Sequence, residues 1–262
     1  MSWPRQRATT AATASNSSND KVVKVIFGIK VGFKIDLGSR LKTAVPELPK
    51  CLAPIAGKSF LEWQINFILA QGVTEIILSL GHLAERVIEE LDKNWSSGLP
   101  IRYAIERDLL GTGGAIRNCM ELFDLEHSLV TNGDTLVGGN ILGLAKPLDL
   151  GNGELLRMGT VAVDDSGRFG RVNIDTHGRV VSFLEKTQIG PGRINAGFYH
   201  LHQSCFASIH SRSFSLEQDV FPNLTSRGAV YSYDLDGPFI DIGIPDDYHF
   251  LANNFSNFFN AS

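Results

Sequence analysis

Leu129-Val130-Thr131-Asn132-Gly133-Asp134-Thr135 is the stretch around which the rest of the chain is organised. Its first residues have the character of a buried strand, which Asn132-Gly133 ends. In an open α/β sheet ligands bind at the carboxyl ends of the strands, so Asp134 is well placed to hold Mg²⁺, which takes carboxylate and phosphate oxygens. Taken alone, a simple turn with Asp134 capping the next segment is the better interpretation. Other segments of the chain change that balance.

Composition limits the class of protein. The chain has 262 residues, 43% hydrophobic and 20% charged, with a formal net charge of -4. These values are typical of a globular protein and argue against a nucleic-acid partner, which favours a basic surface. No apolar run approaches the ~20 residues that a membrane span requires, so no membrane partner is expected. The three widely spaced cysteines favour a reducing, cytoplasmic compartment without disulfides or a zinc site.

The first 20 residues differ from the rest. They are rich in Ser, Thr, Ala and Asn and offer too little apolar surface to offset the entropy of ordering, which predicts a disordered tail. Their basic, acid-poor character also resembles an organelle transit peptide, but the short length and the lack of an amphipathic stripe favour a plain tail. Residues 21–262 are expected to form one domain.

Periodicity predicts the fold. Short apolar runs that indicate strands alternate with segments of helical spacing from about residue 22 to residue 131, which favours βαβ units. Ser59 and Glu62 form a capping box before one helix, and Gly72 is its expected end. We therefore predict a Rossmann-like α/β domain with a mostly parallel sheet. From about residue 155 to residue 199 strand signals follow one another, which predicts a small antiparallel subdomain.

Several polar and glycine-rich motifs recur in a fixed order along the chain. They are Gly38-Ser39-Arg40-Leu41, Pro49-Lys50, Leu110-Gly111-Thr112-Gly113-Gly114-Ala115, Asn132-Gly133-Asp134, Phe183-Leu184-Glu185-Lys186, Asn195-Ala196-Gly197 and Asp241-Ile242-Gly243-Ile244-Pro245. With this set the chain resembles the sugar-phosphate nucleotidylyltransferases, which have a glycosyltransferase-A-like fold. It most resembles the small bacterial-type enzymes that act with GTP on manno-heptose 1-phosphate or mannose 1-phosphate. Such an enzyme makes a nucleotide-sugar and pyrophosphate.

The resemblance implies a role for each matching residue. It implies Arg40, Lys50 and Asp134 as catalytic residues, with Asp134 and Asp241 sharing one Mg²⁺. It implies nucleotide-binding by Leu37, Gly38, Ser39, Glu106, Gly111, Thr112 and Gly113, with Glu106 accepting from the guanine amino edge. It implies sugar-phosphate-binding by Gly170, Glu185, Lys186 and Asn195. The oligomeric state stays open, with a homo-oligomer among the alternatives.

Plain structural interpretations exist for several of these residues. Glu185-Lys186 after a strand is usually a solvated edge, Gly113-Gly114 before a helix can be a tight turn, and Lys50 can be a surface charge. The seven histidines show no metal-ligand spacing, and His200 and His202 are expected to face solvent or to make local bonds.

One segment departs from the family pattern. Where the family has two glycines before its Gly-Thr-Arg-Leu motif, this chain has Ile35 and Asp36 within the run Phe27–Asp36. A β-branched residue resists the backbone angles of a phosphate-binding loop, and a carboxylate repels phosphate. A sequence error, a lost activity and an alternative loop through Gly28 and Gly32 all account for it. The second of these leaves an alternative function, a catalytically impaired regulatory homologue that binds nucleotide-sugar.

Overall fold

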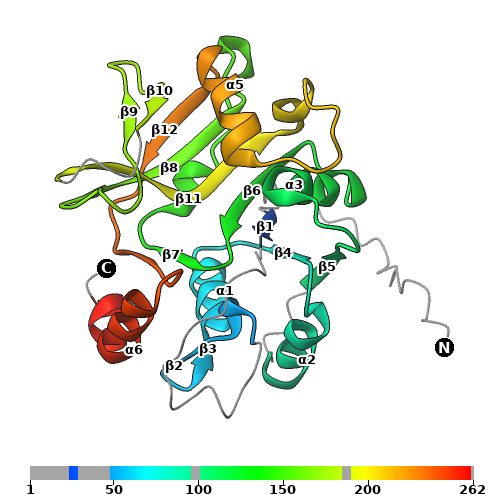
Figure 1. Cartoon of the computed structure of the whole chain (residues 1–262), viewed down its shortest axis with the longest axis vertical. Coiled ribbons are helices and arrows are strands. Elements are labelled where there is room, and N and C mark those ends of the chain that lie inside the picture. The colour runs from blue at the N-terminus through cyan, green and yellow to red at the C-terminus, as the bar shows by residue number, and fades with distance from the viewer. Residues whose placement is uncertain (1–23, 29–47, 96–100, 185–189, 261–262) are drawn as a thin grey trace.

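Seven strands form one central sheet in the computed structural model of the chain, which describes residues 24–28, 48–95, 101–184 and 190–260 (Figure 1). Their order is β12 (Val230–Asp234), β8 (Leu156–Val163), β11 (Gly192–His202), β6 (His127–Asn132), β1 (Lys24–Gly28), β4 (Glu75–Leu80) and β5 (Ile101–Ile105). Neighbouring strands are parallel except where β11 pairs with β6 and with β8. The predicted mostly parallel α/β sheet is therefore confirmed.

Helices cover both faces of this sheet, and each face has its own hydrophobic core (Figure 1). Successive strand residues point to opposite faces, so Val25 packs with α1 (Phe60–Ala70) and α2 (Ala84–Asn94), whereas Ile26 packs with α3 (Gly111–Leu122) and α5 (Phe221–Ser226). Burial on both faces is the reason why β1 and β4 read as continuous apolar runs.

The predicted boundaries of α1 are confirmed in atomic detail. The Ser59 hydroxyl accepts a hydrogen bond from the Glu62 amide, and the Glu62 carboxylate accepts one from the Ser59 amide. Gly72, with a φ of +90°, follows the end of the helix. Helix α2 begins at Ala84, directly after Leu83, which takes a left-handed conformation with a φ of 62°.

The antiparallel part is smaller than predicted. Strands β8 and β11, which the sequence assigned to a subdomain at about 155–199, belong to the central sheet. The separate antiparallel element among the described residues of that range is the hairpin of β9 (Val172–Ile174) and β10 (Val180–Phe183). An alternating apolar pattern predicts that a segment is a strand but does not predict which strand it pairs with. Here β8 and β11 pair with each other along most of their length and extend the main sheet.

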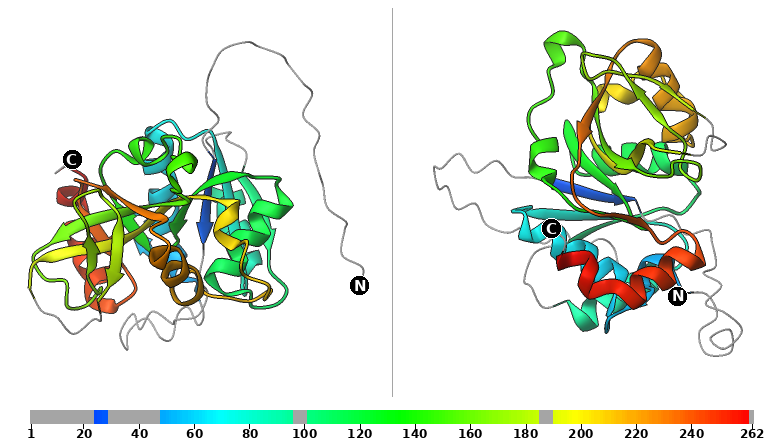
Figure 2. Two further views of the ribbon diagram at one scale, coloured as in Figure 1. Left: turned by 90° about the horizontal axis from the view of Figure 1, so that it is seen from above. Right: turned by 90° about the vertical axis from the view of Figure 1, so that its left-hand side faces the viewer.

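A third core joins the C-terminal part of the chain to α1. Strand β7 (Thr135–Val137) pairs with β13 (Phe239–Asp241), and both pack with α6 (Pro245–Asn260), which begins at the predicted proline. Figure 2 shows α6 beside α1, where Trp63 and Phe255 lie 4.3 Å apart between ring centroids. The short strands β2 (Pro54–Ile55) and β3 (Lys58–Ser59) and the short helix α4 (Ile141–Leu144) complete these elements.

Within the described residues, every helix is too short or too polar to cross a membrane.

Candidate functional site

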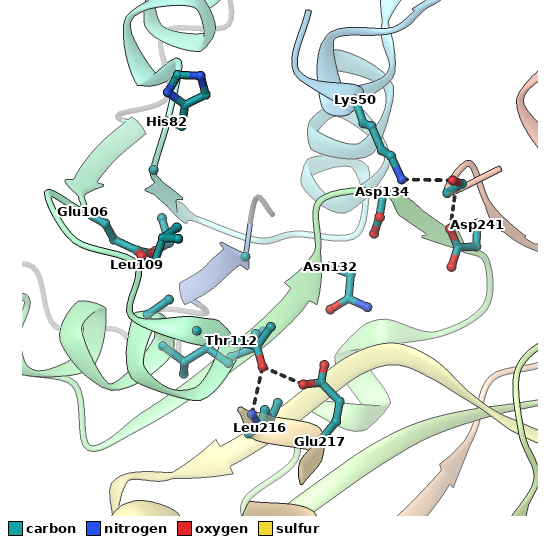
Figure 3. Close-up of a pocket in the computed structure, with 18 residues that line it drawn as sticks. Lys50, His82, Glu106, Leu109, Thr112, Asn132, Asp134, Leu216, Glu217 and Asp241 are labelled. Carbon is teal, nitrogen blue, oxygen red and sulfur yellow. Dashed lines mark hydrogen bonds between the residues drawn. The ribbon is translucent and has the colours of Figure 1, made fainter. Parts of the chain in front are cut away.

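A cleft of about 460 Å³ opens at the carboxyl ends of the parallel strands. Several segments line it, and among their residues are Gly28 at the end of β1, Ser79, Gly81 and His82 around the end of β4, Glu106 after β5, Gly111 and Thr112 at the start of α3, Asn132 at the end of β6, Asp134 after it, and Asp241 at the end of β13. The cleft runs from Glu106 and Leu109 at one end to Lys50, Asp134 and Asp241 at the other (Figure 3). It lies where an α/β sheet binds ligands.

Asp134 and Asp241 converge at one end of this cleft although 107 positions separate them, counted from their residue numbers. The antiparallel pair of β7 and β13 brings them together, since Asp241 lies opposite Thr135 and the Ile242 amide donates to the Asp134 carbonyl at 2.9 Å. Burial, and after it the neighbouring Asp134 charge, raise the pKa of Asp241 to about 6. The convergence predicted from the sequence is confirmed.

Lys50 approaches the same end of the cleft from the other side. It lies in the short 3₁₀ helix Lys50–Leu52, is only 8% exposed, and donates from Nζ to the Gly243 carbonyl at 3.0 Å. The Gly243 amide in turn donates to Asp241 Oδ1 at 2.7 Å. This chain of bonds, drawn in Figure 3, holds a cation close to the two carboxylates, and Lys50 lowers the pKa of Asp241. Lys50 is therefore not the plain surface charge that the sequence also allowed.

The two carboxylates fit a hard divalent cation. They are oxygen donors beside one another at the end of the cleft, and burial, followed by the Asp134 charge, keeps the pKa of Asp241 raised although Lys50 lowers it. Mg²⁺ needs only one or two carboxylates beside phosphate oxygens and water. Asp134 and Asp241 are thus the residues of this cleft that would hold the ion.

Glu106 is the acidic group at the other end of the cleft. Its carboxylate accepts from the Ser79 hydroxyl at 3.0 Å and from the Leu110 amide at 3.4 Å. Burial raises the pKa of Glu106, and these two bonds oppose the rise. The fixed carboxylate can accept further hydrogen bonds from a planar ligand that carries adjacent N–H groups.

Three lining residues were missed by the sequence analysis. His82 and Leu109 stand beside Glu106, and Leu109 is 81% exposed at the mouth of the cleft. Glu217 lines the cleft from the other side and accepts from the Thr112 hydroxyl at 2.6 Å and from the Ser215 hydroxyl at 2.9 Å. The Gly81-His82 pair ends a predicted strand, which is the signal that could have drawn attention to His82.

The glycines of the Gly111–Gly114 motif pack against a neighbouring segment. A Cβ on Gly111, whose φ is +71°, would lie 2.5 Å from the Phe214 carbonyl oxygen, and one on Gly114 would lie 2.5 Å from the Arg212 carbonyl oxygen. The amides of Gly113 and Gly114 both donate to the Phe214 carbonyl, at 3.1 and 3.3 Å. Gly111 and Thr112 line the cleft, and Gly113 does not.

Two further predicted residues lie away from the lining of the cleft. Gly170, with a φ of +75°, follows β8 in the loop before the β9–β10 hairpin. Asn195 lies in β11, donates to the Tyr199 hydroxyl at 2.8 Å and accepts from the Gly197 amide at 2.9 Å. Leu37, Gly38, Ser39, Arg40, Glu185 and Lys186, and the altered run from Ile29 to Asp36, fall outside the described residues.

The loop that carries Gly170 is tied to the acidic end. Arg168 forms a bidentate ion pair with Asp247 in the first turn of α6. The ring of Phe169 packs edge-on against Phe239, the first residue of β13. The hairpin and the strand that ends at Asp241 are therefore joined directly.

The family model described as "Nucleotidyl transferase" matches residues 37–257. The chain is 38% identical over 223 residues to D-glycero-alpha-D-manno-heptose 1-phosphate guanylyltransferase of Campylobacter jejuni, a match that covers 83% of this chain and 96% of the relative. It is 35% identical to mannose-1-phosphate guanylyltransferase of Mycobacterium tuberculosis, a match that covers 80% of this chain and 60% of the relative.

Solved structures agree with these matches. The crystal structure of HddC from Yersinia pseudotuberculosis complexed with GMP-PN superposes with a TM-score of 0.76 at 32% identity, covering 89% of this chain and 99% of that chain. A putative glucose-1-phosphate thymidylyltransferase from Bacillus anthracis superposes with a TM-score of 0.70 at 18% identity, which supports the fold alone.

Proposed function

The chain belongs to the nucleotidyl transferase family, and from this premise we propose that it transfers a guanylyl group from GTP to a sugar 1-phosphate. The sugar is D-glycero-D-manno-heptose 1-phosphate or mannose 1-phosphate, the substrates that the relatives' names specify. A phosphate oxygen of the sugar attacks the α-phosphorus of GTP, a new P–O bond forms, and pyrophosphate leaves with the electrons of the broken bond. The products are a nucleotide-sugar and pyrophosphate.

One observation carries the proposal: a base-sized, acidic end and a carboxylate-rich end lie in the same cleft. Glu106, held by Ser79, accepts from the adjacent N1–H and 2-amino groups of guanine, a pair that adenine lacks. Leu109 and His82 flank the base from the sides of the cleft. The phosphates then extend past Thr112 towards Lys50.

Charge neutralisation dominates the chemistry at the other end. Negative charge develops on the α-phosphoryl group and on the leaving pyrophosphate, so catalysis rests on positioning and on positive charge. Lys50, held by the Gly243 carbonyl, offers one such charge close to the α-phosphate. Asp134 and Asp241 would hold Mg²⁺, which would supply a second positive charge beside the phosphates. Arg40 and Lys186 are proposed to bind the triphosphate and the sugar phosphate, with Glu185 accepting from the sugar hydroxyls.

Catalysis is favoured over the regulatory alternative, because the similar proteins are named as guanylyltransferases. The test is a pyrophosphate-release assay with purified full chain over a matrix of four nucleoside triphosphates and several sugar 1-phosphates, with MgCl₂. We expect release that requires GTP together with heptose or mannose 1-phosphate. Tight binding of nucleotide-sugar by a folded sample that turns over no pair would support the regulatory function instead.

A further inference from the structure

A cluster of histidines lies at the opposite end of the sheet from the cleft. His127 begins β6 and His202 ends β11, and the two residues are direct partners in the antiparallel pair. Their side chains therefore share one face of the sheet, with the ring centroids 4.7 Å apart. Contrary to the solvent-facing alternative considered from the sequence, His200 and His202 are 6% and 8% exposed.

A carboxylate completes the cluster. Glu126 directly precedes His127, and its Oε1 lies 3.3 Å from Nε2 of His202. One ligand atom from each of Glu126, His127 and His202 lies within 4.8 Å of the other two. Two donors on one tetrahedral Zn²⁺, each about 2.0–2.1 Å from the ion, are separated by about 3.3 Å. The Glu126 and His202 atoms already have this spacing, and the remaining pairs, within 4.8 Å, must approach by at most about 1.5 Å to match that geometry.

An ion pair between His202 and Glu126 does not account for the whole cluster. Glu126 is 66% exposed, so such a pair contributes little to stability. Nδ1 of His127 is buried and has no hydrogen-bond partner among the described residues, and a buried polar atom of that kind calls for an explanation.

We propose that Glu126, His127 and His202 bind one Zn²⁺, with water in the fourth position. Imidazole nitrogens with a single carboxylate suit zinc, whereas the all-oxygen pair of Asp134 and Asp241 suits Mg²⁺. The two sites lie at opposite ends of β6, whose six residues span five steps of about 3.3 Å, or about 17 Å. The zinc would join the segment before β6 and the start of β6 to the end of β11, and so stabilise the chain independently of catalysis.

The structure also limits the affinity. The Ser204 amide donates to Nδ1 of His202 at 3.2 Å, so in the metal-free neutral ring the proton resides on Nε2. Zinc on Nε2 forces that proton to move to Nδ1, and the Ser204 amide then loses its acceptor. Losing one backbone hydrogen bond costs about tenfold in affinity. We therefore expect this site to bind zinc less tightly than a closed structural zinc site, because binding here costs the hydrogen bond between the Ser204 amide and His202.

The test is calorimetric titration of the metal-stripped full chain with ZnCl₂ in the presence of excess MgCl₂. Two variants remove a zinc ligand: His202→Asn, which keeps an acceptor for the Ser204 amide, and Glu126→Gln, which keeps the shape. His177→Ala, in the exposed turn between β9 and β10, is the matched control. Thermal unfolding of each sample with and without ZnCl₂ supplies a second readout that does not depend on activity.

We expect one Zn²⁺ per chain for the wild type and for His177→Ala, with a higher melting temperature when zinc is present. In His202→Asn and Glu126→Gln the affinity should fall at least about tenfold and the thermal shift should disappear. The proposal is overturned if the wild type binds no zinc, if the two ligand variants bind it like the wild type, or if the control loses as much affinity as they do.

Discussion

The ionised side chain of Asp241 is expected to destabilise the metal-free protein. Its folded-state pKa of about 6 lies above the value of about 3.9 for an unfolded chain, so the folded state binds this proton more tightly. Stability of the metal-free protein from this group is therefore fully present below about pH 4 and is lost as the pH rises towards 6. The destabilising charge of Asp241 beside Asp134 is consistent with a role in binding a cation, which would offset the repulsion between the two carboxylates.

Replacing Asp241 by Asn should stabilise the metal-free protein above pH 6. The amide carries no charge and keeps an oxygen for the Gly243 amide, so we expect a gain of about 1–2 kcal/mol at pH 8 that shrinks below pH 5. Urea unfolding of wild type and variant in EDTA at both pH values measures this. If the variant is less stable than the wild type at pH 8, or if the difference in free energy of unfolding is the same at both pH values, the charge of Asp241 does not destabilise the folded protein.

Glu106 is expected to determine the choice of base. In Glu106→Gln one acceptor becomes a donor that faces the N–H groups of guanine, and a lost charge-assisted bond is worth roughly 10- to 100-fold in affinity. The KM for GTP should rise by that order and the preference for GTP over ATP should fall, with a smaller change in kcat. Ser79→Ala, which removes only the supporting bond, should have a weaker effect. An unchanged GTP-to-ATP ratio would place the base elsewhere.

Among the elements, the turn into α3 gives the glycines of the Gly111–Gly114 motif a packing role beside their predicted binding role. The sequence assigned the Gly111–Gly114 glycines to close approach of the base. The structure places the Phe214 and Arg212 backbones, rather than open cleft, where Cβ atoms would stand on Gly111 and Gly114. These contacts come from a segment about a hundred residues away, so no local pattern could have indicated them.

Gly111→Ala should therefore lower stability as well as activity. The added Cβ would lie 2.5 Å from a carbonyl oxygen on a backbone with positive φ, and the two effects together are expected to cost about 2–3 kcal/mol. Gly81→Ala is the matched control in the same cleft, because a Cβ there meets nothing within 4 Å. Urea unfolding compares the two variants, and similar free energies of unfolding would refute the packing role.

Other elements were predictable because their signals are local. The capping box at Ser59 and the glycine after the same helix depend on neighbouring residues and appear where expected. The partners of β8 and β11 depend on long-range pairing, which is why the predicted subdomain was too large. For the same reason the histidine spacing along the chain did not reveal that His127 and His202 are strand partners.

At the scale of the whole molecule, the fold brings together two carboxylates that are far apart in the sequence. Asp134 ends a motif in the middle of the chain, and Asp241 reaches it only because β13 pairs with β7 and α6 packs beside α1. The order of the motifs suggested a shared site, but the antiparallel pair that creates it involves strands of three residues, too short to predict from a pattern.

The most direct test of the account is kcat/KM for nucleotide-sugar formation from GTP in the wild type, Asp134→Asn, Asp241→Asn and the double variant, with MgCl₂. Because each carboxylate is useful only with the ion that both hold, each single variant should lose nearly all turnover and the double variant should be scarcely worse. All variants should keep a cooperative unfolding transition. If Asp241→Asn retains wild-type activity, or if the two losses multiply in the double variant, the carboxylates do not act as one unit.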